Sequence, residues 1–372
     1  MTPRETAIIL NLIPGLGPVG ARRLMQAFAS PELILEAPAA MLMRVEGIGP
    51  AQARNITEWK SIVNLHRETE LAEQARADIT TIFDERYPHP LRNLYAPPLA
   101  LYSWGTWTRA DMERSLAVVG SRMATHYGRL CAKNISSRLA EAGVTIISGL
   151  ARGIDTAAHE GAMDAGGRTI AVVGAGLNRL YPEENRPLAH RIAEGRGAVI
   201  SEFPMNMPPS RATFPMRNRI VSGWGCATLV VEASARSGAL ITARLASEQG
   251  KEVFCIPGPV DKHSSDGCHA LIRDGATLAT GAADLLHDMK WESPVQDLPL
   301  FSSPASSTEK KTIPLNREEE HLLQAIRQGF NTIDALCAAE GCPAPDITAR
   351  LAKLQIAGRI IPDAGGYFTI VP

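Results

Sequence analysis

The sequence lacks the cysteine patterns of disulfide scaffolds and zinc sites. It contains 6 cysteines in 372 residues, scattered without a CxxC pair and without histidines at the spacing of zinc ligands. Reduced thiols in a cytosolic protein are the simplest interpretation of such a distribution. We therefore expect a cytoplasmic protein that holds no metal ion.

Long apolar runs are also missing. No run approaches the roughly 20 apolar residues that span a bilayer. The first residues, Met1-Thr-Pro-Arg-Glu, lack the apolar segment of a secretory signal. We expect neither secretion nor a membrane partner.

An excess of positive charge is absent too, because 38 lysines and arginines face 39 aspartates and glutamates, a formal net charge of -1. This balance excludes a protein that binds polyanions by bulk charge, but it permits a local basic groove. The hydrophobic content of 45% is ample for a core in a chain of two to three domains.

Short apolar runs separated by helix-length stretches are present in the middle of the chain. They cover residues 116–119, 144–147, 169–173, 198–200, 227–231 and 252–256. Continuously apolar, β-branched runs at this spacing predict buried parallel strands, hence an α/β fold with a doubly wound, mainly parallel sheet. The loops after parallel strands gather at one edge, and the turns here contain Arg122, Arg152, Arg179 and Arg236. Arginines at such an edge favour a phosphate ligand.

The regions on either side have different patterns. Residues 13–22 and 45–54 form a near-repeat, Gly-x-Gly followed by a helix expected to begin near Pro18 or Pro50. This indicates two helix-hairpin-helix units, whose N–H groups can approach a DNA phosphate; the alternative is a pair of tight turns that only pack a helical domain. A long helical pattern ending near Asp78 and a Pro/Tyr-rich, extended segment then lead to the central region.

Towards the end of the chain, residues 293–314 have the Pro/Ser-rich composition of a flexible linker. A helix with Asn316 as its expected cap, helices over 333–339 and 346–357, and a hairpin around Ala364-Gly-Gly follow in winged-helix order. Arg350 and Lys353 share a face of the third helix. They could contact DNA, or form an ordinary solvated face of a protein-contact module.

The first two loops of the central region have the design of anion sites. Gly120-Ser121-Arg122 leads into a helix expected over 127–141, and Gly149 and Gly153 flank Arg152 before the next helix. We expect Asp155 to cap or orient that helix rather than to act as an acid or base.

The third loop, which begins at Gly174, resembles a dinucleotide fingerprint but has Arg179 in place of the last glycine. No acidic residue stands at the later position that such a site needs, so we expect no NAD and no other cofactor.

The segment 211–219 contains Arg211, Phe214, Arg217, Asn218 and Arg219. Arginines beside an aromatic ring suit single-stranded nucleic acid, since charges follow the backbone while a ring stacks on a base. The alternative is that Phe214 belongs to the core and Arg217 pairs with Glu202 or Glu232, and that one of the later arginines is structural. A hydroxyl-rich turn at 232–242, with Ser237, Gly238 and Thr242, can also hold phosphate.

Taken in order, the motifs at 120–122, 148–155, 214–220, 232–242 and 256–258 resemble the DprA (Smf) family of bacterial DNA-processing proteins. The resemblance implies an extended Rossmann-like domain, here 71–290, between a SAM/helix-hairpin-helix-like domain (1–70) and, after a linker (291–315), a winged helix (316–372). It implies a non-enzymatic protein that binds and protects single-stranded DNA, loads the RecA recombinase in natural transformation and forms a homodimer through the Rossmann-like domain. The site residues it implies include Gly120, Ser121, Arg122, Arg152, Arg211 and Phe214.

The late turn departs from the family pattern, because His269 stands where asparagine is expected. We expect no catalysis there, since Cys268 and His269 lack a third residue that would orient them as a nucleophile and its base. The same scaffold could support a nucleotide-cleaving phosphoribohydrolase, although the loop at Ser237 is not followed by the glutamate of that group. It could also support a nucleotide sensor that signals through its winged helix.

Overall fold

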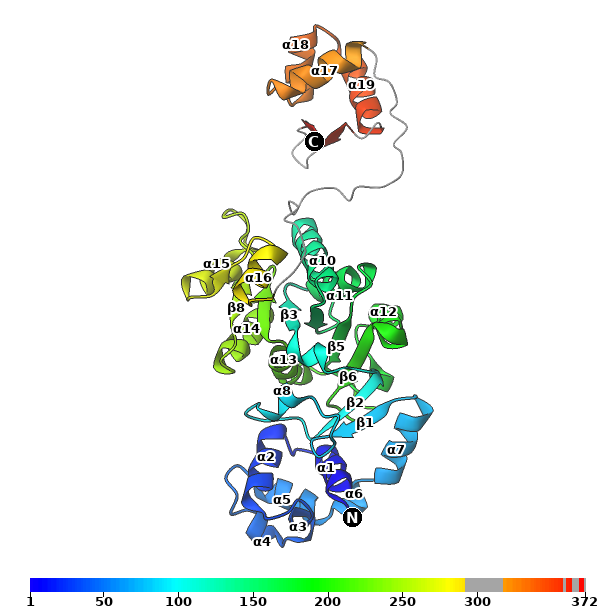
Figure 1. The fold of residues 1–372 in the computed structure, drawn as a ribbon, viewed down its shortest axis with the longest axis vertical. Helices are drawn as coiled ribbons and strands as arrows, with labels where there is room; N and C mark the ends of the chain where they lie inside the picture. Colours follow the sequence, from blue (N-terminus) through cyan, green and yellow to red (C-terminus); the bar gives the residue numbers. More distant parts are fainter. Residues whose placement is uncertain (292–316, 357–358, 363–367, 371–372) are drawn as a thin grey trace. The chain divides into compact units, whose positions relative to one another are not determined.

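The computed structural model of the protein describes residues 1–291, 317–356, 359–362 and 368–370 (Figure 1). These residues belong to two compact units, Met1–Phe301 and Ser302–Pro372.

A mixed sheet forms the centre of the first unit, with the strand order β1-β2-β6-β5-β4-β3-β7-β8-β9 among the described residues. The strands are β1 (Asp78–Thr81), β2 (Ala100–Gly105), β3 (Ser115–Val119), β4 (Thr145–Ser148), β5 (Thr169–Val173), β6 (Gly197–Ser201), β7 (Ala227–Val230), β8 (Val253–Cys255) and β9 (Thr277–Leu278). From β6 to β9 all neighbours are parallel, whereas β1 and β2 are antiparallel additions at one edge. The six predicted strands, β3 to β8, are confirmed.

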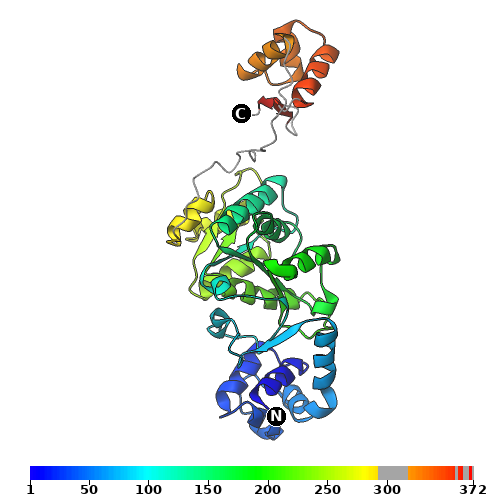
Figure 2. The same cartoon turned by 45° about the vertical axis from the view of Figure 1, so that its right-hand side comes forward.

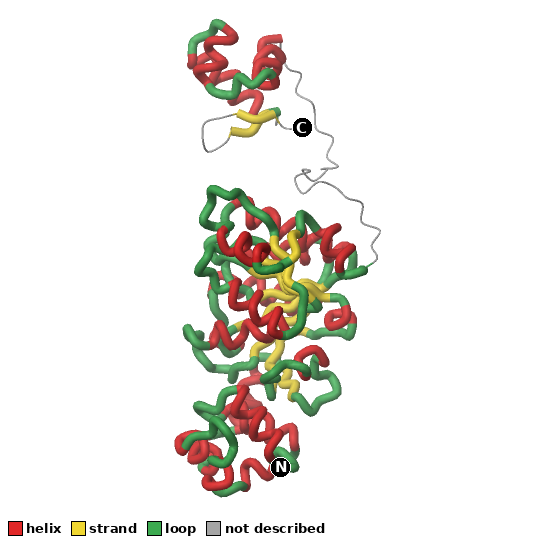
Figure 3. The backbone as a smooth tube through the Cα atoms, turned by 90° about the vertical axis from the view of Figure 1, so that its left-hand side faces the viewer, coloured by secondary structure: helices red, strands yellow, loops and turns green. Residues whose placement is uncertain are grey.

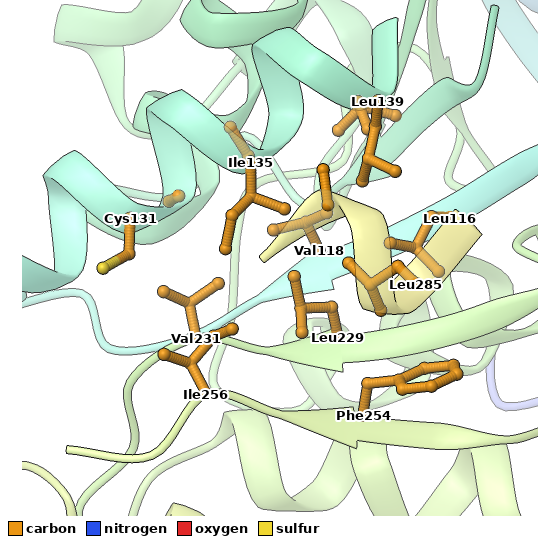
Figure 4. Packing of buried hydrophobic residues seen from close by; sticks show 14 of the residues in the cluster. Leu116, Val118, Cys131, Ile135, Leu139, Leu229, Val231, Phe254, Ile256 and Leu285 are labelled. Carbon is orange, nitrogen blue, oxygen red and sulfur yellow. The ribbon is translucent and has the colours of Figure 1, made fainter. Parts of the chain in front are cut away.

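Helices cover both faces of this sheet (Figure 3). They are α8 (His89–Arg92), α9 (Ala110–Glu113), α10 (His126–Glu141), α11 (Ile154–Asp164), α12 (Arg186–Arg191), α13 (Thr213–Trp224), α14 (Ala239–Glu248), α15 (Asp266–Arg273) and α16 (Ala282–Asp288). Along β3, Leu116 and Val118 pack under α10 and α16, while Ala117 and Val119 belong to the core on the α13 and α14 side (Figure 4). Both faces are buried, which explains the continuously apolar strands.

The segment before the sheet differs from the sequence-based expectation. The long helix predicted to end near Asp78 is two helices, α6 (Trp59–Ile62) and α7 (Leu65–Gln74). The break has a local cause, because the Asn64 side chain accepts a hydrogen bond from the backbone N–H of Arg67 (2.8 Å) and starts a new helix. Asp78 begins β1, and the Pro/Tyr-rich segment contains the short helix α8 rather than extended chain alone.

Short helices pack at the β1–β2 end of the sheet (Figure 2). They are α1 (Pro3–Leu12), α2 (Pro18–Ala27), α3 (Glu32–Glu36), α4 (Ala39–Leu42) and α5 (Pro50–Thr57). The helix starts predicted at Pro18 and Pro50 are confirmed. Equivalent positions of the repeat make equivalent contacts: Arg23 Nη1 donates to the Glu46 carbonyl and Asn55 Nδ2 to the Pro14 carbonyl, both at 2.9 Å. The repeat therefore folds as an interlocked pair of hairpins.

The second unit has the predicted winged-helix order. Helices α17 (Arg317–Arg327), α18 (Ile333–Glu340) and α19 (Ala344–Ile356) precede an antiparallel pair, β10 (Ile360–Pro362) and β11 (Phe368–Ile370). The predicted linker beyond Trp291, the predicted cap Asn316 and the turn at Ala364 lie outside the described residues.

Candidate nucleic-acid interface

A polar pocket of about 590 Å³ lies where the loops after β3, β4 and β7 meet α13. The structure brings nine of the predicted site residues into its lining: Gly120, Ser121, Arg122, Gly149, Arg217, Asn218, Ser237, Gly238 and Thr242. We call this the strand-end pocket. Its position follows from the parallel sheet, because the carboxyl ends of the strands share one edge.

Backbone hydrogen bonds join the first loop of the pocket to the loops after β7 and β4. The Ser121 N–H donates to the Glu232 carbonyl (2.7 Å), and the Ser121 carbonyl accepts from the Ile154 N–H (3.2 Å). Gly153 has φ +76°, and a Cβ there would lie 2.3 Å from the Ser121 carbonyl oxygen. Only glycine allows the two loops to come this close.

The Glu232 carboxylate fixes the end of the first loop, where the chain enters α10. Both carboxylate oxygens of Glu232 accept hydrogen bonds from the Thr125 N–H (3.0 and 3.3 Å), and one also accepts from the Thr125 hydroxyl. Glu232 is thus occupied by the chain that enters α10, and it does not pair with Arg217.

Arg217 forms the floor of the pocket. Its side chain is buried, and Nη1 donates to the carbonyls of Gly149 and Val172. Asp155 lies on the other side of Gly149 and accepts from the N–H groups of Gly149 (3.1 Å) and Ala151 (3.2 Å). A Cβ on Gly149 would be 2.2 Å from Arg217 Nη1 and 2.6 Å from Asp155 Oδ2, so glycine is required there too.

Burial shifts the pKa of both ionisable groups under the pocket. Desolvation lowers the pKa of Arg217 to about 10, against the opposing effect of the Asp155 charge. Desolvation also raises the pKa of Asp155, although Arg217 and the two N–H groups favour its charged form. Asp155 was expected to cap or orient its helix, but the N-cap of α11 is Gly153 and Asp155 is the second residue of the helix. Through the two N–H groups it orients the loop that leads into the helix.

The rim of the pocket joins a cation to an aromatic ring. The guanidinium carbon of the exposed Arg122 lies 4.9 Å from the centroid of the Phe214 ring. Phe214 is partly exposed at the start of α13, rests against Gly174 and has the Tyr181 ring 5.8 Å away. The interpretation of Phe214 as a core residue is therefore wrong.

Arg152 and Gly174 lie outside the lining of the pocket. Arg152 is exposed and makes a two-pronged ion pair with Glu184 across the surface, with Nη2 2.8 Å from Oε2. This contact raises the pKa of Arg152 and lowers that of Glu184. Because both partners are solvated, the pair leaves Arg152 able to exchange its carboxylate for another anion.

The other arginines of the 211–219 segment have separate environments. Arg219 points away from the pocket: it pairs with Glu202 (Nη1–Oε2, 2.8 Å) and donates Nε to the Ala96 carbonyl (3.0 Å). Arg211 is exposed before α13 and has no ion pair among the described residues. The alternative interpretation correctly expected a structural arginine in this segment and an arginine paired with Glu202. The partner of Glu202 is Arg219, however, and not Arg217.

Three polar residues of the lining were not singled out from the sequence: Ser234, His263 and Ser264. The last two lie in the loop after β8. Because loops after parallel strands gather at one edge of the sheet, the loop after β8 was also expected there. Its polar run, Asp261-Lys-His-Ser-Ser, could have indicated these residues from the sequence.

The pocket is suited to binding anions. It presents the hydroxyls of Ser121, Ser237 and Thr242, the guanidinium of Arg122 and the entrance of α14, where Gly238 is the N-cap and no acidic residue occupies the first turn. His269 Nε2 lies 3.0 Å from the Gly258 carbonyl, and Cys268 is buried, so neither residue lines the pocket. The fold and this pocket define a Rossmann-like protein with a pocket at the carboxyl edge of its sheet.

The chain belongs to the DprA (Smf) family. Residues 78–290 match the family of DNA recombination-mediator protein A, residues 8–58 match the SAM-like helix-hairpin-helix tandem, and residues 306–366 match the DprA winged helix domain. The resemblance expected from the ordered motifs is confirmed. Within the described part of the chain, no helix has both the length and the apolar character that a membrane span requires.

Relatives cover the chain to different extents. Protein Smf of Escherichia coli is 39% identical over 299 residues, 79% of this chain and 78% of its own. The structure of DNA processing protein A from Streptococcus pneumoniae has a TM-score of 0.66 and 33% identity, covering 77% of this chain and 98% of its own. The Helicobacter pylori protein, described for its single-stranded DNA binding mode, has a TM-score of 0.52 and 28% identity, over 57% and 96%.

Proposed function

We propose that the strand-end pocket binds the backbone of single-stranded DNA, and that the protein protects this strand and passes it to the RecA recombinase in natural transformation. The observation that carries the proposal is the Arg122 guanidinium over the Phe214 ring at the mouth of a pocket lined by hydroxyls. A cation beside a ring suits a phosphate followed by a base. The single-stranded DNA binding described for the Helicobacter pylori relative supports it.

The pocket residues have distinct roles in this proposal. Ser121, Ser237, Gly238 and Thr242 hold phosphate, Arg122 neutralises it, and Phe214 stacks on a base. Gly120, Gly149, Gly153 and Gly174 allow close approach of the loops or the ring, Asn218 adds a polar contact, and Arg217 and Arg219 hold the loops and α13 in place. Arg152 and Arg211 contact the strand farther out.

We further propose that the protein acts by binding and not as an enzyme. The carboxylate nearest the pocket, Asp155, already accepts two loop N–H groups, and α14 has no acidic residue in its first turn. A phosphoribohydrolase would need a free carboxylate there. Incubation with nucleoside monophosphates should release no base, and released base would overturn this part of the proposal.

The oligomeric state, the localisation and the domain boundaries are proposals that rest on family membership. We propose a cytoplasmic homodimer that associates through the Rossmann-like part, with functional boundaries at 1–70, 71–290, 291–315 and 316–372. The exposed Ile241 on α14 and Leu278 on the edge strand β9 are apolar groups that such an interface could cover. Light scattering of the full chain should give twice the monomer mass.

Charge reversal at the rim tests the central proposal. Arg122→Glu should weaken binding of oligothymidine at least tenfold, because it places a carboxylate where we expect a phosphate. It should also reduce the salt dependence by about 0.7 for each lost phosphate contact. Fluorescence anisotropy measures both effects.

Arg109→Glu is the matched control for that test. Arg109 is an exposed arginine that precedes β3, at the opposite edge of the sheet, where it pairs with Glu113. This variant should bind oligothymidine as the unchanged protein does. Equal binding by the Arg122 variant would overturn the proposed function.

A further inference from the structure

A second basic hollow, of about 560 Å³, lies in the first unit away from the strand ends. It is lined by α2, the α4–α5 connection and Tyr95: Arg22, Arg23, Gln26, Ala27, Phe28, Met41, Arg44, Val45, Glu46 and Tyr95. Three guanidinium groups face one carboxylate there. We call it the arginine–tyrosine pocket.

The aromatic residue of this pocket is already arranged beside a cation. The Arg22 guanidinium lies 4.4 Å from the Tyr95 ring centroid and donates a hydrogen bond to the Tyr95 carbonyl. Tyr95 nevertheless keeps 65% of its surface exposed. The pocket therefore repeats the combination of Arg122 and Phe214 at the strand-end pocket.

The other two arginines differ in how they are held. Arg23 is anchored by Glu46, through the carbonyl (2.9 Å) and the carboxylate (3.2 Å). Arg44 is exposed, and none of the ion pairs among the described residues involves it. Arg44 is thus the cation best placed to bind a new anion.

The two hairpin repeats contribute different residues to this pocket. Arg54 is the equivalent of Arg22 in the second repeat, but it pairs with Glu58 (3.1 Å) and lies outside the hollow. The glycines of the first hairpin, Gly15 and Gly17, line a different cavity together with Glu202. Within the described chain, the lining of that cavity includes no arginine or lysine, so the hairpin loop itself is the weaker candidate.

A groove extends from the arginine–tyrosine pocket towards the sheet. Arg22 and Tyr95 also line a hollow of about 890 Å³ whose other wall includes Met216 of α13 and Leu245 of α14. In Figure 1, α8 lies between α2 and α13. The opposite side of α13, at Asn218, lines the strand-end pocket. One extended strand could thus reach both sites across α13.

We propose that the arginine–tyrosine pocket is a second contact site for single-stranded nucleic acid, with phosphate at Arg44 and Arg22 and a base against Tyr95. Positive charge beside an exposed ring is the recognition chemistry of single strands. The inference rests on the proposed function, since the strand is the one held at the strand-end pocket. The second site lengthens the stretch of strand that the protein contacts, so only an oligonucleotide long enough to reach both sites gains affinity from it.

The test uses the full chain with Arg44→Glu and two oligothymidine lengths, about 6 and about 35 nucleotides, chosen to fill one site or both. We expect several-fold weaker binding of the long oligonucleotide, a salt dependence lower by about 0.7, and unchanged binding of the short one. Tyr95→Ala should reduce long-strand binding on the order of tenfold. Circular dichroism confirms that both variants fold.

Arg54→Glu is the matched control, because it reverses an exposed arginine at the equivalent repeat position outside the pocket. It should leave both oligonucleotides unaffected. Unchanged long-strand binding by Arg44→Glu, or a loss confined to duplex DNA, would overturn the inference. Failure of Arg122→Glu to affect either length would instead overturn the proposed function, so the two results are distinguishable.

Discussion

The strand-end pocket and the third helix of the winged-helix unit both contain basic residues, but the structure uses them differently. At the pocket, Arg122 lies over an aromatic ring without an acidic partner among the described residues. On α19, Arg350 pairs with Glu318 (3.0 Å) and Lys353 lies 4.0 Å from Glu319, both on α17. A basic residue without a carboxylate of the protein within reach is more readily available to a ligand than one in an ion pair.

The two regions also differ in how deeply their charged side chains are buried. Ionisable groups under the pocket, such as Arg217 and Asp155, are buried and hold loops in place. In the winged-helix unit the ion pairs each include an exposed partner. Loss of a buried charge partner costs far more than loss of a surface pair, so the comparison predicts a graded series of effects.

The largest effect is expected for Arg217→Met. It leaves Asp155 without its cation and two buried carbonyls without a donor, which should lower the free energy of unfolding by about 3–5 kcal/mol. Urea unfolding followed by tryptophan fluorescence measures this in the first unit, because all 5 tryptophans precede residue 292.

Arg211→Ala is the control within the same segment. Arg211 is exposed, so its removal should change stability by less than about 0.5 kcal/mol. A stable Arg217→Met variant that fails to bind single strands would show that Arg217 serves the ligand rather than the fold.

Phe214→Ala should weaken single-strand binding by about 1–3 kcal/mol, the contribution of one stacked base. Phe214→Tyr keeps the ring and should preserve affinity. Anisotropy titrations with oligothymidine measure both. If the alanine variant binds normally, the ring at the rim only supports Arg122, and the strand is held by charge and loop N–H groups alone.

Acid should destabilise the first unit through His159. This residue is buried on α11, its Nδ1 is 2.6 Å from the Thr169 hydroxyl, and desolvation lowers its pKa from 6.5 to about 3. Below pH 6.5 the unfolded chain takes up a proton that the folded chain refuses, so stability falls towards pH 3 by up to about 1.4 kcal/mol per pH unit.

Urea unfolding of His159→Gln at several pH values between 3 and 7 should show a shallower loss of stability than the unchanged protein. His66→Gln is the control, because His66 is on the surface of α7. Identical pH profiles for the unchanged protein and the His159 variant would contradict this assignment.

The smallest effect is expected in the winged-helix unit. Arg350→Ala combined with Lys353→Ala removes two ion pairs that each include an exposed partner and should cost about 1 kcal/mol, with single-strand binding unchanged. Thermal unfolding followed by circular dichroism and an oligothymidine titration measure the two quantities. A tenfold loss of binding would abolish the contrast between the two regions.

Local patterns determined much of the fold. The apolar runs predicted β3 to β8, and Pro18 and Pro50 marked the starts of α2 and α5. β1 was missed because it is short and contains the polar pair Thr80 and Thr81, which appears irregular in sequence. β2 was missed because it directly follows the Pro/Tyr-rich segment, which was interpreted as a join to the central region. The break before α7 was missed because one side-chain cap outweighed a continuous helical pattern.

The sequence by itself placed the glycine-rich loops at one edge, because strand polarity and loop position follow from chain order alone. Only the tertiary structure decided the fates of the arginines in 211–219. Arg217 is buried and forms the floor of the strand-end pocket, Arg219 pairs with Glu202, and Arg211 is exposed at the surface. These fates depend on carbonyls and carboxylates from distant segments. The energy of a charge is set by the partners and solvent around it, and sequence spacing does not specify those partners.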